Sequence, residues 1–292
     1  MGEETINRQF KDRLFKLVFG TKKDLLNLYN AINGTDYRNA DDIEINTIQE
    51  CIYMTMRNDV SFLLYDVMNL FEHQSTRNPN MPLRGLFYLT QLYKTSFEKH
   101  KDLYSTKQIP IPTPQFVVFY NGDDEEPDER YMKLSDSYIA PISGPPALEC
   151  QARLLNINVG HNAELMEKCK RLRDYSTLVK YVKDNLKSGM DKEKAVNEAI
   201  DRCLREKVLF DILSKHRKEA TDMLLTEYDE IAHINNEKDI SHEEGGLERQ
   251  TLMLEIMERL NAGEGIDSLL SCGLDRETLE KMASLMNGTR KE

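Results

Sequence analysis

The sequence predicts an α/β region with a mixed sheet flanked by helices up to about residue 160, followed by an all-α C-terminal extension. Before residue 160, short runs of β-branched and aromatic residues alternate with amphipathic helical segments. After Asn162, almost every segment has helical periodicity. The 292 residues are enough for about two domains, and 40% hydrophobic with 30% charged residues is typical of a folded protein.

The first elements are predicted to form a helical hairpin. Ile6–Phe19 has apolar residues on one helical face, and Gly20 ends it. A second helix fits Lys22–Ile32 and stops at Asn33-Gly34. The Ile6–Phe19 helix is expected to flank the sheet, together with the helix that follows Pro82.

The next segments are predicted to supply the sheet. Ile43–Gln74 contains short β-branched and aromatic runs without helical periodicity, which favours strands. A helix fits Pro82–Tyr104, and the apolar run Gln115–Tyr120 predicts a strand buried on both faces. Asp123–Arg130 is expected to be an acidic loop, and Ala147–Val159 one more extended segment.

The rest of the chain is predicted to be helical. Four helices are expected, at Ala163–Arg173, Tyr175–Ser188, Asp191–Arg205 and Val208–Ile234. A polar linker, Asn235–Gly246, separates them from a last helical piece at Leu247–Met286. The expected division is therefore a domain at 1–160, a helical extension at 161–235 and a small helical tail at 247–292.

Composition excludes several classes of protein. No run approaches the roughly 18 apolar residues of a membrane span, and the N-terminus lacks a signal-peptide core, so we expect a cytoplasmic protein without a membrane partner. The five cysteines show no metal or disulfide spacing. The net charge of −11 argues against nonspecific attraction to nucleic acid, yet residues 1–120 hold 14 basic and 14 acidic residues.

One segment points to chemistry. If Tyr65-Asp66 forms a two-residue turn, the flanking strands pair with residue numbers summing to 131, and Asp59 lies opposite Glu72. Opposed residues share a sheet face, where like charges destabilise the pairing. Gln74 follows Glu72 by two residues and therefore points to the same face. A divalent cation is the natural compensation.

Such a site suits phosphodiester hydrolysis. Two carboxylates can hold Mg²⁺, which polarises a phosphate and activates a water. The alternative is that Asp59 and Glu72 form an ordinary acidic pair on a solvated face. A register shift of one residue would also place them on opposite faces.

Five sequence blocks occur in order over about residues 6–160: Phe10–Lys16, Asn58–Phe62, Glu72–Thr76, Asn78–Arg84 and Val117–Gly122. Together they resemble a known family, the Rpn recombination-promoting nucleases and putative transposases of the PD-(D/E)XK nuclease superfamily.

This resemblance implies a restriction-endonuclease-like core that uses Mg²⁺ or Mn²⁺. Asp59 and Glu72 would bind the metal together with the backbone carbonyl of His73, and Gln74 would occupy the position of the superfamily's Lys. Gln74 has no charge, so it would act through hydrogen bonds. Asn58 stands where the superfamily motif has Pro.

Other residues have candidate roles with simpler alternatives. Arg84, near a helix N-terminus, could contact a DNA phosphate or be a solvated surface residue. The His73 side chain should point away from Glu72, which favours packing over catalysis. Residues 168–187 hold seven basic residues; Lys168, Lys170 and Arg171 are DNA-binding candidates, the alternative being a solvated helix face.

The C-terminal tail suggests interaction more than DNA reading. Ile266–Met282 has helix, glycine turn and helix spacing, but residues 241–292 hold 6 basic against 11 acidic residues. Met253 and Met257 suit a small core or a homo-oligomer contact. The sequence thus predicts a Mg²⁺-dependent DNA endonuclease active in DNA recombination; the alternative is a non-catalytic, nuclease-like protein that binds DNA or a protein partner.

Overall fold

The computed structural model describes residues 14–46, 59–97, 106–140, 142–262, 264–270, 276 and 278–281. The chain forms two compact units, Met1–Asp229 and Glu230–Glu292. The first unit contains the sheet and most of the described helices, so the predicted domain at 1–160 and all but the last six residues of the predicted extension at 161–235 belong to one compact unit.

A six-stranded mixed sheet organises the first unit, in the order β1-β2-β3-β4-β6-β5. Strands β3, β4 and β6 run parallel, whereas the β1–β2, β2–β3 and β5–β6 pairs are antiparallel. The strands are β1 Glu44–Ile45, β2 Val60–Leu64, β3 Val67–Gln74, β4 Thr113–Tyr120, β5 Glu129–Lys133 and β6 Gln151–Asn156. The α/β class and the mixed sheet are confirmed.

The β2–β3 hairpin has the register predicted from the sequence. Tyr65 and Asp66 form its turn with φ of 45° and 60°, the positive values that a tight two-residue turn needs to match strand twist. Val60 pairs with Phe71 and Leu64 with Val67, so paired residue numbers sum to 131. This register governs which side chains share each face.

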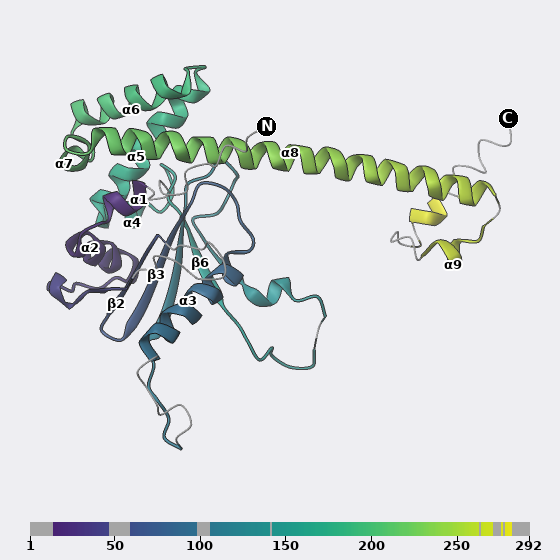
Figure 1. Ribbon diagram of the computed structural model, residues 1–292, viewed down its shortest axis with the longest axis horizontal. Helices are drawn as coiled ribbons and strands as arrows, with labels where there is room; N and C mark the ends of the chain where they lie inside the picture. Colours follow the sequence, from purple (N-terminus) through teal and green to yellow (C-terminus); the bar gives the residue numbers. More distant parts are fainter. Residues whose placement is uncertain are drawn as a thin grey trace, which may run out of the picture. The chain divides into compact units, whose positions relative to one another are not determined.

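One sheet face is covered by the N-terminal hairpin and α4 and α5 (Figure 1). These helices are α1 Leu14–Val18, α2 Lys22–Asn33, α4 Ala163–Lys168 and α5 Lys170–Lys187. Helix α6, Lys192–Glu206, packs on α5, and α7, Phe210–Leu213, contacts α6. Phe15 of α1 packs on Phe119 with ring centroids 5.1 Å apart, and Phe119 meets Phe71 at 5.4 Å. Phe71 and Phe119 are fully buried, which anchors the helices to the sheet.

The opposite sheet face is covered by α3, Met81–Phe97 (Figure 1). Its apolar residues pack on Met68, Leu70 and Val118, which alternate with the residues of the other face. Gly85 allows the close approach, because a Cβ there would lie 2.3 Å from Cε1 of Phe116. The helix backbone therefore lies directly over β4.

The last long helix differs from the prediction. Helix α8 runs from Arg217 to Asn261 without a break, so the predicted linker Asn235–Gly246 is helical. The polarity of this segment does not prevent a helix, because Glu and Lys favour helices and each interior glycine costs only about 1 kcal/mol. The strand β5 was also missed: it begins inside the predicted acidic loop Asp123–Arg130, at Glu129, and has no continuous apolar run.

The remaining elements are short. The described residues include the 3₁₀ helices η2 at Ala40–Asp42 and η4 at Leu134–Ser137. In the second unit, α9 spans Ile266–Leu269, and Leu269 packs with Ile256 and Leu279. Among the described residues, no helix combines the length and apolar composition needed to cross a bilayer.

Some predicted segments lie partly outside the described residues. These are the start of the Ile6–Phe19 helix, the end of the helix after Pro82, positions 47–58 of the predicted strand region Ile43–Gln74, and parts of Leu247–Met286, which include the turn of the helix-turn-helix pattern and positions 282–286. The block Asn58–Phe62 enters the description at Asp59.

Candidate functional site

The hairpin register brings two carboxylates together on the α3 face. Asp59 immediately precedes β2, opposite Glu72 of β3. The Asp59 backbone N–H donates to Oε1 of Glu72 at 3.1 Å, and the His73 N–H donates to Oδ2 of Asp59 at 2.6 Å. Each carboxylate is thus held by the backbone of the opposite strand, and the predicted juxtaposition is confirmed.

Arg84 provides positive charge beside this pair. Its Nη2 lies 3.3 Å from Oε2 of Glu72, whose side chain is only 1% exposed, and 3.1 Å from the Tyr88 hydroxyl. A buried carboxylate is unfavourable unless it is paired, so Arg84 stabilises Glu72. The sequence predicted either a DNA-phosphate contact or a solvated position for Arg84; in the structure its guanidinium contacts Glu72.

Tyr88 is the second α3 residue beside Glu72, through its contact with Arg84, and it was not predicted from the sequence. Burial raises its pKa, and the nearby Glu72 carboxylate raises it further. The hydroxyl therefore stays protonated at neutral pH. The four-residue spacing of Arg84 and Tyr88, which puts both side chains on one helix face, is the signal that could have revealed it.

Gln74 offers a buried donor on the same face. Its side chain is 6% exposed, and it follows Glu72 by two residues along β3. Among the described residues, its Nε2 has no hydrogen-bond partner. Buried amides are nearly always hydrogen-bonded, so this donor is suited to a bound water or ligand oxygen.

The His73 side chain points to the other sheet face, as predicted. Its Nε2 lies 3.1 Å from the Tyr175 hydroxyl of α5, and its ring stacks on Phe15 at 5.7 Å. Glu227 of α8 approaches Nδ1 at 3.8 Å. The imidazole is therefore a packing group, while the backbone N–H of the same residue orients Asp59.

The three other predicted DNA contacts lie on helices of the opposite sheet face. Lys168 pairs with Glu164 at 2.6 Å, and Lys170 pairs with Asp174. Arg171 binds two carboxylates, 2.7 Å from Asp24 and 2.8 Å from Asp211. The structure does not bring these residues to the carboxylate pair, and each is engaged in an internal ion pair.

The donor chemistry of the site suits Mg²⁺. Asp59 and Glu72 are hard oxygen donors, and Mg²⁺ in proteins often uses only one or two carboxylates together with waters and phosphate oxygens. Among the described residues, no group of three or more His, Cys, Asp or Glu side chains is arranged to hold a metal ion. A bound ion would therefore depend on Asp59, Glu72 and non-protein ligands, with the His73 carbonyl as the candidate implied by the family resemblance.

Metal addition should stabilise the protein through this pair. We expect Mg²⁺ or Mn²⁺ at millimolar concentration to raise the melting temperature, because a ligand that binds only the folded state stabilises it. Differential scanning fluorimetry against EDTA measures the shift. The Asp59→Ala/Glu72→Ala protein should lose the shift, and an equal shift in both proteins would place metal binding elsewhere.

Comparison of the chain with protein-family models, with curated proteins and with solved structures gives no match. The family resemblance therefore rests on the sequence blocks. The two most specific of these blocks lie side by side in the sheet. Glu72–Thr76 includes the end of β3, Val117–Gly122 includes the end of the neighbouring strand β4, and Gln74 lies opposite Tyr120 in their register.

Proposed function

We propose that this protein is a metal-dependent endonuclease of restriction-endonuclease-like fold that hydrolyses phosphodiester bonds in DNA. The observation that supports the proposal is the β2–β3 hairpin: Glu72 and Gln74 share one face of β3, and Asp59, directly before β2, is joined to Glu72 and His73 by two hydrogen bonds. Oxygen donors for Mg²⁺ and a buried amide donor are thereby combined at one site. The resemblance to the Rpn nucleases uses the same three residues.

Each residue has a distinct task in the proposed site. Asp59 and Glu72 would hold Mg²⁺, which when bound supplies polarisation of a phosphate oxygen and a more acidic water. The His73 N–H fixes the orientation of Asp59. Gln74 Nε2 would donate to a phosphate oxygen or to the attacking water.

The rival function is a nuclease-like protein that binds DNA or a protein partner without cutting. One observation favours it: Arg84 already supplies the positive charge that buried Glu72 requires. Incubation of the purified full chain with supercoiled plasmid and Mg²⁺, beside Asp59→Ala protein, separates the two functions. Cleavage lost in the variant supports the endonuclease; plasmid left intact by both proteins supports the rival.

Gln74 variants test the role of the amide donor. We expect Gln74→Ala to slow cleavage by about 10²-fold, the usual effect of losing one donor to transition-state charge. Gln74→Lys should retain much more activity, because the ammonium also donates and matches the superfamily's usual residue. Single-turnover cleavage of a labelled duplex measures both rates.

Gln115→Ala is the matched control for this series. Gln115 also lies in the sheet, but its amide bonds to Asn33, with its Nε2 2.7 Å from the Asn33 Oδ1. This variant should cleave at close to the wild-type rate. Equal losses for Gln74→Ala and Gln115→Ala would show a general effect on the fold and remove the role proposed for Gln74.

A further inference from the structure

Two sequence features that the proposed catalytic site does not use meet in one cleft. They are the Asn121-Gly122 pair after β4 and the basic stretch of α5. The cleft, of about 780 Å³, lies between the 121–128 loop, the segment after β6 and one face of α5. This is the carboxyl end of parallel strands, where open α/β sheets commonly bind ligands.

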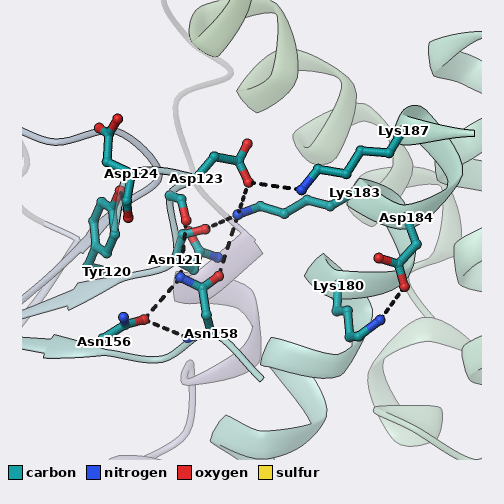
Figure 2. A network of polar contacts seen from close by, with 11 residues as sticks. Tyr120, Asn121, Asp123, Asp124, Asn156, Asn158, Lys180, Lys183, Asp184 and Lys187 are labelled. Carbon is teal, nitrogen blue, oxygen red and sulfur yellow. Dashed lines mark hydrogen bonds and ion pairs between the residues drawn. The ribbon is translucent and has the colours of Figure 1, made fainter. Parts of the chain in front are cut away.

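The α5 wall of the cleft is basic. Lys180, Lys183 and Lys187 line it at spacings of three and four residues, which put them on one helix face. The Lys183 side chain is only 13% exposed; it donates to the Asn121 carbonyl and lies 3.1 Å from Oδ1 of Asp123 (Figure 2). Lys187 lies 3.8 Å from the same oxygen. A single carboxylate oxygen therefore bridges two ammonium groups.

The Asp123 carboxylate lies between Lys183 and Lys187, where an anion from solution could bind in its place. Its side chain is 68% exposed, and ion pairs that open to solvent are weak and easily exchanged. A phosphate carries more charge and more acceptor oxygens than a carboxylate, so it can replace Asp123 between Lys183 and Lys187.

The other acids of the cleft are mostly paired. Lys180 binds Asp184, and His161 Nδ1 lies 2.7 Å from Asp128. Asp124 and Glu125 also line the cleft but are exposed, so solvent and salt screen their repulsion of an anion. The acid that pairs with both Lys183 and Lys187 is therefore the exposed Asp123, whose side chain can move into solvent when another anion binds.

Asn121 adds a second, independent indication of a ligand. It lines the cleft and is 1% exposed, and among the described residues neither polar atom of its side-chain amide has a hydrogen-bond partner. Its backbone is fixed, because its N–H donates to the Gln74 carbonyl at 3.0 Å. A buried amide without partners is unfavourable. A ligand oxygen would accept a hydrogen bond from its Nδ2, and a bound water would donate one to its Oδ1.

We propose that this cleft binds a phosphate ester and that, in the endonuclease proposed above, it holds a backbone phosphate of the DNA beside the cleavage site. The DNA assignment rests on the proposed function. The connection is structural: the Asn121–Gln74 hydrogen bond joins the cleft to the strand that carries Glu72 and Gln74. The same chemistry could be supplied by a free nucleotide, so the experiment has one arm for each source.

The first arm measures binding of a labelled duplex of about 20 base pairs by fluorescence anisotropy in EDTA, where nothing is cut. Lys187→Gln should weaken binding by about 3- to 10-fold and lower the salt slope by about one. Asp123→Asn should tighten binding by a similar factor, because it releases Lys183 and Lys187. Misfolding cannot produce such a gain.

Lys168→Gln is the matched control, because Lys168 is an exposed, ion-paired lysine outside the cleft. It should change DNA affinity less than twofold. Equal losses for Lys187→Gln and Lys168→Gln, or an Asp123→Asn protein with unchanged or weaker affinity for both ligands, would overturn the cleft as a phosphate site.

The second arm titrates thymidine 5′-monophosphate by calorimetry into the same proteins. Tightening by Asp123→Asn for the nucleotide alone would support the phosphate site but overturn its assignment to DNA. The arms also separate this inference from the proposed function. If the wild type cuts no plasmid but Asp123→Asn tightens DNA binding, the phosphate site is supported and the endonuclease function is not. If the wild type cuts plasmid but the cleft variants leave DNA binding unchanged, the endonuclease function is supported and the phosphate site is not.

Discussion

Asp59→Asn is expected to reduce plasmid cleavage in Mg²⁺ by at least about 10²-fold while leaving DNA affinity within about twofold of wild type. Asparagine keeps nearly the same volume, and its Oδ1 can still accept the His73 N–H. The substitution therefore removes the negative charge while preserving the local fold. Gel assays of nicking and linearisation, with anisotropy for binding, measure the two effects.

Asp66→Asn is the matched control for this charge change. Asp66 lies in the turn of the same hairpin at φ 60°, a conformation that asparagine adopts readily. Its cleavage rate should equal that of wild type. If Asp59→Asn cuts as fast as wild type, with contaminating nuclease excluded, the proposal of catalysis at this site is wrong. The non-catalytic binding function is then the better explanation of the site.

Arg84→Met should lower the free energy of unfolding in EDTA by about 2 kcal/mol. Glu72 is 1% exposed and Arg84 is 26% exposed, so the loss should be smaller than for a fully buried pair. Methionine keeps the apolar stem and favours a helix, so the change isolates the charge. If a metal ion and Arg84 both compensate Glu72, Mn²⁺ should stabilise the variant more than wild type. Urea denaturation with and without Mn²⁺ tests this.

Arg77→Met provides the comparison. Arg77 lies 3.3 Å from the buried Glu126, but Glu126 keeps Arg130 at 2.9 Å. This variant should lose less stability and should respond to Mn²⁺ as wild type does. If Mn²⁺ raises the free energy of unfolding of Arg84→Met no more than that of the wild type, no metal ion replaces Arg84 beside Glu72. That result would favour the non-catalytic function.

The carboxylate pair could be predicted because its geometry is local. A two-residue turn at Tyr65-Asp66 and a strand period of two are sufficient to place Asp59 opposite Glu72, with Gln74 on the same face. The direction of the His73 side chain, toward the opposite sheet face from Glu72, follows from the same period. The predicted helices Lys22–Ile32 and Asp191–Arg205 also agree with the structure, because strong amphipathic periodicity is a local property.

The charges that surround the site could not be predicted in this way. The contact of Arg84 with Glu72 depends on how closely α3 packs on β4, which Gly85 permits over Phe116. Lys168, Lys170 and Arg171 were predicted to bind DNA because the sequence shows that they are basic but not which carboxylates they contact. The partners of Arg171, Asp24 and Asp211, come from distant parts of the chain.

By itself, the sequence determined the α/β class, the hairpin register and the shared face of Asp59, Glu72 and Gln74, because turn chemistry and side-chain period act over a few residues. Only the tertiary structure decided which cation lies beside Glu72, that His73 contacts Tyr175 and that Asn121 meets Lys183 in a cleft. These contacts join residues from separate elements, and their positions depend on how the helices pack on the two faces of the sheet.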